Sequence, residues 1–176
     1  MNLHDKQFEI YMDSTVIQNR VREIGLEINK DYKDKSPLFI GVLNGAFMFA
    51  ADLFKHLIID SEISFIKMSS YRDFSSTGDV KQLLGLNEPI FNRNVILLED
   101  IVDSGDTITT LLELMSSLGP KSIEVASLLV KPNALKHKIY IKYTGFEIPE
   151  DFIVGYGMDY NGLGRNLNEL YQIKSN

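Results

Sequence analysis

The chain has no cysteine among its 176 residues, and this absence excludes several kinds of chemistry at once. Disulfide bonds, thiolate nucleophiles and cysteine-based zinc sites all need a residue that the sequence does not contain. Histidine is also scarce, because His4, His56 and His137 are the only three, and they are scattered without the spacing of metal ligands. The sequence therefore predicts neither a disulfide framework nor a metal site built from cysteine or histidine.

Basic residues are in the minority. The 18 lysines and arginines are outnumbered by 24 aspartates and glutamates, so that the formal net charge is −6 at pH 7. A protein that binds a nucleic-acid backbone needs a basic face, so nucleic acid is not expected as the main partner. A small anion that is accompanied by a divalent cation is compatible with an acidic protein.

Long apolar runs are missing as well. No stretch approaches the roughly 20 residues that a membrane-spanning helix needs, so no membrane partner is expected. The first residues, MNLHDKQFEIYMDS, do not combine a basic region with an apolar run, so they do not resemble a signal peptide. The sequence shows no low-complexity segment and no fixed-period repeat. A length of 176 residues then indicates one domain, which we expect in the cytoplasm.

Apolar segments indicate the order of the secondary-structure elements. A helix is expected over 14–31, because Asp13 and Ser14 are good helix caps and apolar residues recur at helical spacing after them. Short, continuously apolar runs such as 37–43 and 94–98 are typical of strands that are covered on both faces. The remaining expected elements are a helix from about Gly45, strands over 62–71 and 122–131, a hairpin strand over 79–85, a helix over 107–119, and short strands over 151–157 and 170–173.

This order of elements, in which buried strands alternate with helices, predicts an α/β domain with a mainly parallel central sheet flanked by helices. In such sheets ligands bind at the carboxyl ends of the strands, where the loops gather. Three polar loops follow expected strands, namely NGA at 44–46, EDIVDSGDT at 99–107 and KPN at 131–133. We therefore expect these loops to converge on a functional site.

The loop DSGDT, residues 103–107, has the features of a phosphate-binding turn. Gly105 permits backbone dihedrals that a residue with a Cβ resists, so that neighbouring amides can turn toward one point. The helix that follows adds unpaired N–H groups and the positive end of its dipole, and Ser104 and Thr107 add hydroxyls. The pattern is not a Walker A loop, which requires GxxxxGK[ST]. Taken alone, the loop could equally be a helix cap made by its two aspartates and its serine.

Two carboxylates, Glu99 and Asp100, precede this loop at the end of an apolar strand, where helix capping does not need them. Adjacent residues on a strand point to opposite sides, so the pair is not expected to act as a single two-pronged clamp. Carboxylates suit the hydroxyls of a sugar, and they suit magnesium, which prefers oxygen ligands and keeps several waters. A phosphate cradle beside such groups fits a ribose 5-phosphate, and Asp103 would then lie near the anomeric carbon.

The segment VILLEDIVDSGDT, residues 95–107, resembles the phosphoribosyl diphosphate motif of type I phosphoribosyltransferases, in which two acids and two apolar residues precede Asp-Ser/Thr-Gly-x-Thr. The rest of the chain resembles the hypoxanthine (hypoxanthine-guanine) phosphoribosyltransferases. Further segments appear in that family's order, namely GVLNGAFMFAADL, SSYRDFSSTGDV, SLLVKP and GFEIPEDFIVGYGMDYNGLGRNL. The similarity extends from about residue 10 to residue 173, and so many segments in order are highly specific.

The resemblance implies the type I phosphoribosyltransferase fold, as a single domain over residues 1–176 with a small hood from about 1–12 and 145–176 and a mobile flap over about 69–80. It implies magnesium-dependent transfer of the phosphoribosyl group from phosphoribosyl diphosphate to hypoxanthine, or to guanine, with release of pyrophosphate, in purine salvage. It also implies that the partners are these small molecules and that the chain forms a homodimer or homotetramer.

The resemblance further implies roles for individual residues. Glu99 and Asp100 would hold the ribose hydroxyls, directly or through metal and water, and Asp103 would act as general base or acid on the five-membered ring of the purine. The other implied roles are the 5-phosphate cradle at Asp103, Ser104, Gly105, Asp106 and Thr107, the pyrophosphate contacts at Asn44, Gly45 and Arg165, the flap at Ser70 and Tyr71, and the purine side at Lys131, Phe152, Ile153 and Asp159, where Asp159 also holds a second magnesium ion.

On the purine side, Lys131 would donate to the exocyclic oxygen, Phe152 would stack on the base, and the backbone at Ile153 would read its edge. Without the resemblance these residues have plainer interpretations, because a lysine at a strand end is usually solvated and a phenylalanine usually belongs to the core. Asp159 and Arg165 could likewise form a surface ion pair of little energetic consequence.

Two positions depart from the family pattern. Family members commonly carry Lys or Arg at the position of Asn44, often after a cis peptide bond, so one cation for pyrophosphate is missing here. The turn NGLGR, residues 161–165, has glycines and leucine where aromatic residues are usual, so the purine rim is expected to differ in shape. Two alternatives stay open, an enzyme that prefers xanthine or another 6-oxopurine, and a regulator of the same fold that binds RNA through its one basic cluster at 131–142.

Overall fold

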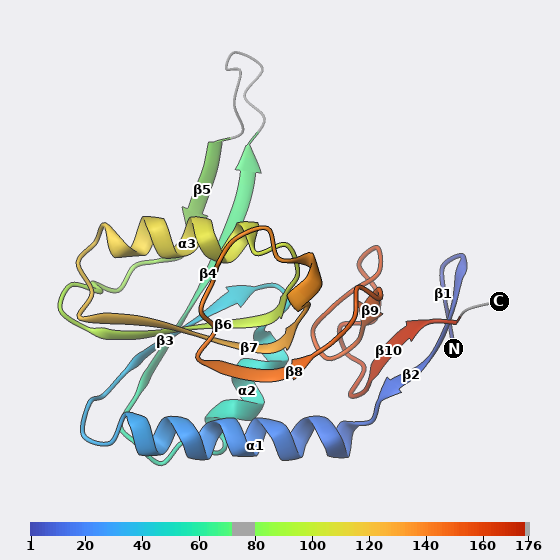
Figure 1. The fold of residues 1–176 in the computed structure, drawn as a ribbon, viewed down its shortest axis with the longest axis horizontal. Helices are drawn as coiled ribbons and strands as arrows, with labels where there is room; N and C mark the ends of the chain where they lie inside the picture. Colours follow the sequence, from blue (N-terminus) through green and yellow to red (C-terminus); the bar gives the residue numbers. More distant parts are fainter. Residues whose placement is uncertain (72–79, 175–176) are drawn as a thin grey trace.

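A computed structural model of the chain describes residues 1–71 and 80–174 and divides their strands between two sheets (Figure 1). The larger sheet has six strands in the order β5-β4-β3-β6-β7-β8, and the smaller sheet has four in the order β1-β2-β10-β9. The polar loop at 72–79, which makes up most of the expected flap, lies outside the described residues.

The larger sheet is parallel apart from one edge strand. Strands β4, β3, β6, β7 and β8 pair in parallel, and β5 pairs with β4 antiparallel, as expected of a hairpin partner. These strands are β3 (Leu38–Leu43), β4 (Glu62–Tyr71), β5 (Val80–Leu84), β6 (Asn94–Val102), β7 (Ser122–Val130) and β8 (Tyr143–Glu147). The prediction of an α/β fold with a mainly parallel central sheet is confirmed.

Helices cover both faces of this sheet. Helices α1 (Ser14–Asp31) and α2 (Phe47–Phe54) lie on one face, and α3 (Asp106–Ser116) lies on the other (Figure 1). Helix α1 begins where its sequence indicates, because the Asp13 carboxylate accepts hydrogen bonds from the backbone N–H groups of Thr15 and Val16 at 2.8 and 3.1 Å. These bonds pair two of the N–H groups that a helix start otherwise leaves without partners.

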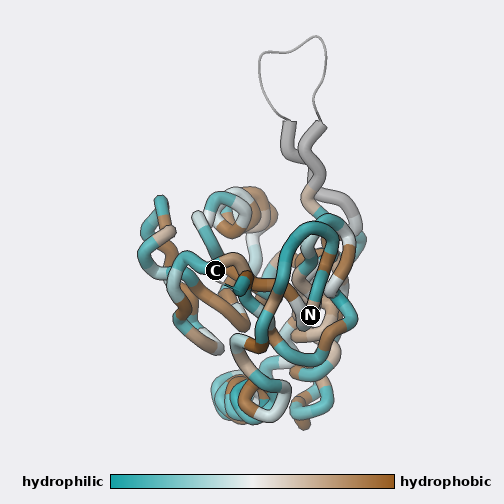
Figure 2. Tube along the Cα trace, turned by 90° about the vertical axis from the view of Figure 1, so that its right-hand side faces the viewer, coloured by the Kyte–Doolittle hydropathy of each residue, from teal (hydrophilic) through white to brown (hydrophobic). Residues whose placement is uncertain are grey.

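Each helix layer buries an apolar stripe against the sheet. The stripe of α1 consists of Ile17, Val21, Ile24 and Ile28, and that of α3 consists of Ile108, Leu111 and Met115. Figure 2 shows hydrophobic and hydrophilic positions around both helices, as expected of helices that are buried on one side only. Over residues 1–71 and 80–174, no helix combines the length and the apolar character that crossing a membrane requires.

Both ends of the chain meet in the smaller sheet. Its strands are β1 (Asn2–Leu3), β2 (Lys6–Met12), β9 (Ile153–Val154) and β10 (Leu170–Ile173), and β10 pairs with both β2 and β9. Residues 143–147, where the expected hood over about 145–176 begins, form β8 in the larger sheet, and the hood itself stays a prediction. The sequence predicts neither β2 nor β8, because neither is a continuous apolar run and each pairs with a strand that its own residues do not identify.

Two element boundaries near the expected site differ from the sequence prediction. Strand β6 extends to Val102, so the carboxylates at 99–100 lie within the strand and not at its end. Helix α2 begins at Phe47, later than expected, after a cis peptide bond between Leu43 and Asn44. The turn between β3 and α2 thus begins with the cis peptide that the family resemblance implies.

Candidate active site

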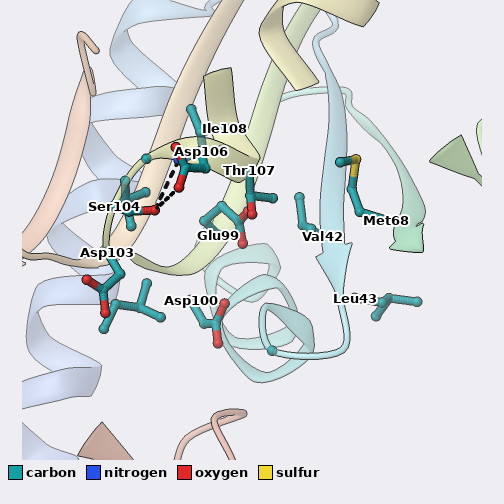
Figure 3. Close-up of a pocket in the computed structure, with 14 residues that line it drawn as sticks. Val42, Leu43, Met68, Glu99, Asp100, Asp103, Ser104, Asp106, Thr107 and Ile108 are labelled. Atoms are coloured by element: carbon teal, nitrogen blue, oxygen red, sulfur yellow. Dashed lines mark hydrogen bonds between the residues drawn. The ribbon is translucent and has the colours of Figure 1, made fainter. Parts of the chain in front are cut away.

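The three polar loops that follow β3, β6 and β7 meet beside the smaller sheet. Two cavities of about 320 and 280 Å³ open there, and they share Gly45, Asp100, Ile101 and Asp103. The first cavity is lined by strand ends and by the loop 103–107 (Figure 3). The second is lined in addition by Lys131 and by tail residues between 152 and 165. The structure therefore brings the predicted loops together in one site with two ends.

The loop 103–107 lines the first cavity. Gly105 adopts a left-handed conformation with a φ of +82°, and α3 begins directly after it. A Cβ at this position would lie 2.5 Å from the end of the Ile139 side chain, so a larger residue would meet both a left-handed backbone and a neighbour that has to shift. Because the first turn of a helix leaves N–H groups without partners, this turn offers an anion both amides and the positive end of the helix dipole.

Helix capping explains only part of this loop. Gly105 is the N-terminal cap of α3 and makes no side-chain capping bond. The Ser104 hydroxyl accepts a hydrogen bond from the Asp106 N–H at 3.3 Å and donates one to the Asp106 carboxylate at 2.8 Å (Figure 3). The Asp103 carboxylate instead pairs with Lys131. Capping therefore does not account for Asp103.

Asp106 places a negative charge at the start of α3, and several partners surround it. Its carboxylate lies 2.7 Å from Nε2 of His137 and 3.3 Å from Nζ of Lys136, in addition to the bond from Ser104. The contact with His137, followed by those with Ser104 and Lys136, holds the pKa of Asp106 well below its usual value. Asp106 is therefore an anion throughout the neutral pH range.

The two carboxylates of β6 line the same cavity, although adjacent strand residues are expected to point apart. Glu99 is 5% exposed, and burial, followed by the charge of Asp100 and a hydrogen bond to it, raises the pKa of Glu99 well above its usual value. Burial also raises the pKa of Asp100, against the opposing effects of backbone hydrogen bonds and of the Arg165 charge. Such a buried acidic pair favours a ligand that brings hydrogen-bond donors or a cation.

The turn after β3 is held between β6 and the tail. A Cβ on Gly45 would collide with the Asp100 carboxylate, so the turn can approach β6 only because residue 45 is glycine. On the other side, Gly157 has a φ of +99°, and a Cβ there would collide with the carbonyl oxygen of Gly45. Asn44 is exposed and lines the second cavity. The predicted pyrophosphate loop is thus packed tightly at Gly45 and open at Asn44.

An ion pair joins Asp103, the predicted general base, to Lys131, the predicted contact of the purine. The Lys131 ammonium lies 2.6 Å from the Asp103 carboxylate. Lys131 follows β7 and is only 7% exposed, whereas more than half of the Asp103 side chain, 57%, is exposed. A buried ammonium requires a partner of opposite charge. Lys131 is therefore not the solvated lysine of the plainer interpretation, and its charge is held within the site.

Phe152 is not a core residue. Its side chain is 44% exposed and lines the second cavity, and its ring meets that of Tyr160 edge-on with centroids 5.6 Å apart. Ile153 is buried beside it in β9, where it pairs with Gln172. An exposed aromatic ring and the backbone of a strand therefore border the same cavity.

Asp159 and Arg165 form an ion pair within the tail. Arg165 also donates to the carbonyl oxygen of Gly157 at 2.7 Å, and the second carboxylate oxygen of Asp159 accepts from the Gly162 N–H at 2.7 Å. Both side chains line the second cavity and are about one-third exposed, at 28% and 31%. The Arg165 charge is thus fixed beside the turn that contains Gly45, and both oxygens of Asp159 have protein partners.

Ser70 and Tyr71 are the last residues of β4, where their backbones pair with Lys81 and Val80. The structure describes their backbone only. Their predicted role in the flap stays a prediction.

Lys136 and His137 contact Asp106 of the loop 103–107, and the reasoning from sequence missed these contacts. Both lie in the segment 131–142, where the sequence shows only a cluster of basic residues. Lysines of this segment are engaged by acidic residues of the chain itself, in the pairs Lys131–Asp103, Lys136–Asp106 and Lys142–Asp31. The cluster therefore does not form the open basic groove that the RNA-binding alternative requires.

The carboxylates of the site suit magnesium better than they suit a metal that needs many protein ligands. In the described part of the chain, no group of three or more acidic or histidine side chains is placed to hold a metal ion. Magnesium usually keeps several waters and is bound by one or two carboxylates together with the phosphates of a substrate. Glu99 and Asp100 are two such carboxylates at one cavity wall, so they fit this ion. Asp159 would have to release one of its present partners to bind it.

Comparison with known proteins identifies similar sequences and similar folds. The phosphoribosyl transferase domain family matches residues 9–161. The hypoxanthine-guanine phosphoribosyltransferase of Staphylococcus epidermidis is 40% identical over 174 residues, which cover 98% of this chain and 97% of that protein. The protein of the same name from Bacillus subtilis is 41% identical over 175 residues, covering 99% and 97% of the two chains. A crystal structure of a hypoxanthine-guanine phosphoribosyltransferase from Bacillus anthracis has a TM-score of 0.87 at 35% identity and covers 97% of this chain and 100% of that one.

Proposed function

This chain belongs to the phosphoribosyltransferase family, among its hypoxanthine-guanine members, and we propose that it joins a 6-oxopurine to the phosphoribosyl group of phosphoribosyl diphosphate. The products are pyrophosphate and inosine or guanosine monophosphate, as in purine salvage. One observation carries this proposal. The Asp103 carboxylate lies where the phosphate loop and the purine-side cavity adjoin, at the place where the two halves of such a product would be joined.

The first cavity would hold the sugar phosphate. The amides of residues 103–107 and the start of α3 bind the 5-phosphate, and the hydroxyls of Ser104 and Thr107 add donors. Glu99 and Asp100, on the wall of the same cavity, accept hydrogen bonds from the ribose hydroxyls. Because the two carboxylates and the loop lie on one strand and its continuation, β6 sets the distance between the phosphate and the diol.

The second cavity would hold the purine. Phe152 stacks on the base, the backbone at Ile153 contacts its edge, and the Lys131 ammonium donates to the exocyclic oxygen of a 6-oxopurine. Lys131 is already paired with Asp103, so a bound base would lie against both groups. As one nitrogen of the five-membered ring bonds to the sugar, the other nitrogen loses its proton. Asp103 accepts that proton. A base that lacks the exocyclic oxygen would leave the buried lysine without that acceptor, which disfavours adenine.

The departing pyrophosphate needs positive charge. Arg165 supplies one charge beside Gly45, and the exposed Asn44 supplies polar contacts without a charge. Glu99 and Asp100 would hold magnesium, directly or through water, and Asp159 would hold a second ion on the pyrophosphate side. When bound, the metal supplies positive charge against the pyrophosphate oxygens. Because the sugar carbon becomes cation-like as this group leaves, stabilising the departing charge is the largest demand on the site.

Four further properties belong to the proposal. Ser70 and Tyr71, at the end of β4, would begin a flap that excludes water from the activated sugar. The hood, expected from about 1–12 and 145–176, would cover the purine side. We also infer a cytoplasmic enzyme that works as a homodimer or homotetramer.

A competition assay tests the proposed function. Hypoxanthine, guanine, xanthine and adenine are offered together with phosphoribosyl diphosphate and magnesium, and the nucleotide products are separated. We expect inosine and guanosine monophosphates as the main products, with little product from adenine. Preferential formation of xanthosine monophosphate would favour the xanthine alternative. Absence of any nucleotide, together with tight and salt-sensitive RNA binding, would contradict the enzyme and favour the RNA-binding regulator.

A further inference from the structure

One segment runs along the outer side of the phosphate loop and contacts four successive residues of it. The contacts are ion pairs, a backbone hydrogen bond and apolar packing. They join Lys131 to Asp103 (2.6 Å), the N–H of Lys136 to the carbonyl oxygen of Ser104 (3.0 Å), Leu135 and Ile139 to Gly105, and Lys136 and His137 to Asp106 (3.3 and 2.7 Å). We call Lys131, Leu135, Lys136, His137 and Ile139 the outer wall of the loop.

Asp106 presents a difficulty for a loop that binds phosphate. Its carboxylate has the same sign of charge as the 5-phosphate, and like charges a few ångströms apart disfavour binding. Asp106 lines the first cavity and its side chain is 46% exposed, so the charge is not hidden from a ligand. Its pKa is held well below the usual value, chiefly by the contact with His137, so protonation does not remove the charge near neutral pH.

We propose that Lys136 and His137 are positioning residues for the 5-phosphate: the ammonium of Lys136 offsets the charge of Asp106, and His137 holds the Asp106 carboxylate, so that the loop can accept a dianion. This inference rests on the proposed function, in which the loop 103–107 holds that phosphate. The ammonium of Lys136 balances the charge of Asp106. The hydrogen bond with His137 holds the Asp106 carboxylate next to the outer wall.

The packing of the outer wall keeps these groups in place. Leu135 and Ile139 are partly buried against the core beneath α3, and they fill the space that a side chain at Gly105 would need. The hydrogen bond from the Lys136 N–H to Ser104 fixes the backbone of the wall against that of the loop. Exposed ion pairs contribute little to stability, so we expect Lys136 and His137 to affect the binding of an anion and not the unfolding of the protein.

Two ligands that differ only in the 5-phosphate test this proposal. The dissociation constants of inosine monophosphate and of inosine are measured by calorimetry for the wild type and for the double variant Lys136→Met, His137→Gln. We expect the double variant to bind inosine monophosphate about tenfold more weakly, because Asp106 is then unbalanced beside the phosphate, and to bind inosine as the wild type does. Lys138→Met is the matched control, because it removes an exposed lysine of the same segment, and both affinities should be unchanged.

A third substitution separates charge from structure. When Asp106→Asn is added to the double variant, affinity for inosine monophosphate should return to within about threefold of the wild type, because the repelling charge is gone. The loss in the double variant should also shrink as the salt concentration rises, because salt screens exposed charges. A structural role of Lys136 and His137 would produce neither effect. Both side chains are more than one-third exposed, so their replacement opens no cavity in the core.

Two results would overturn the proposal. One is unchanged affinity for inosine monophosphate in the double variant, and the other is a loss that Asp106→Asn does not reverse. Failure of the wild type to bind inosine monophosphate at all, or to form it, would refute the proposed function and this inference with it. The two failures are therefore distinguishable.

Discussion

Asp103 and Lys131 show that the environment of a residue decides whether its side chain is solvated or held in a site. Each alone is an ordinary surface type, an acid in a loop and a lysine at a strand end. The fold buries the lysine, leaves the acid accessible and places their charged groups 2.6 Å apart. A buried ammonium with one accessible carboxylate partner makes an exchangeable pair, because a ligand with its own acceptor can take the place of that partner.

Asp103→Asn tests the role of this carboxylate as a proton acceptor. We expect the turnover number for hypoxanthine to fall by about 100-fold or more, because the amide cannot take up the proton that the base sheds. Binding of phosphoribosyl diphosphate should change little, because the amides of the loop are retained. Steady-state kinetics and direct binding of phosphoribosyl diphosphate measure the two effects separately. An unchanged turnover number would remove Asp103 from the mechanism.

At the scale of the element, the turn between β6 and α3 depends on a glycine. Gly105 has a φ of +82°, and a Cβ added there would meet Ile139. Gly162 has a similar φ of +86°, but a Cβ added there would have nothing within 4 Å. Replacing each glycine by alanine therefore separates the cost of a left-handed backbone from the cost of a steric contact. Both replacements face a left-handed backbone that an L-residue resists.

Gly105→Ala should destabilise the protein and weaken the binding of a nucleotide 5-phosphate, because the backbone is left-handed there and either the Ile139 side chain or the loop must shift. Gly162→Ala should cost only the conformational term of about 1–2 kcal/mol and should weaken nucleotide binding less than Gly105→Ala does. Urea unfolding and titration with inosine monophosphate measure these effects. Equal behaviour of the two variants would show that contact with the outer wall does not shape the loop.

The turn after β3 is the second element on which the site depends. It combines a tightly packed Gly45 with an exposed Asn44, where family members commonly carry a cation. Asn44→Lys should therefore tighten product inhibition by pyrophosphate, because a new ammonium would lie at the edge of the second cavity. The inhibition constant of pyrophosphate is the measurement, and Asn44→Gln is the uncharged control. If the lysine variant behaves as the glutamine variant does, side-chain charge at this position is irrelevant to pyrophosphate.

At the scale of the whole molecule, one polar network ties the tail to the helices beneath the main sheet. The Tyr156 hydroxyl donates to the Asp52 carboxylate at 2.6 Å, and Gln18 and Lys55 also donate to that carboxylate. Burial alone would raise the pKa of Asp52, but the hydrogen bonds from Lys55, Tyr156 and Gln18 outweigh it and lower the pKa below its usual value. Tyr156 precedes Gly157, which packs on the turn at Gly45, so the network also supports the turn after β3.

Tyr156→Phe should lower the free energy of unfolding at pH 7 by about 1–3 kcal/mol, since it removes a hydrogen bond to a charged group. Because the pKa of Asp52 is lowered in the folded protein, this stabilisation is present above the unfolded pKa and is lost as the pH falls through the folded one. The difference between wild type and variant should therefore shrink in acid. Denaturant unfolding at neutral and acidic pH measures it, and Tyr140→Phe, at a ring that is 75% exposed, is the control. A difference that does not depend on pH would contradict the assigned bond.

The sequence alone predicts much of the fold, because strong local patterns carry the information. Helix α1, strand β3 and strand β4 begin and end within a residue of their predicted positions, since caps and continuous apolar runs mark them. Strands β2 and β8 are not predicted, because neither is a continuous apolar run and each is stabilised by a neighbour that local sequence does not reveal. The early start predicted for α2 is likewise wrong, because the turn at Gly45 is shaped by contacts with Asp100 and Gly157.

By itself, the sequence determined the family and predicted the phosphate loop with its carboxylates, because these depend on residue types at fixed spacing within one segment. Only the tertiary structure decided what lies across from that segment. It paired Lys131 with Asp103, exposed Phe152, placed Arg165 beside Gly45, and brought Lys136 and His137 onto Asp106. These contacts join residues that are distant in the chain, and the burial and charge of each partner arise only when the strands have paired and the loops have met.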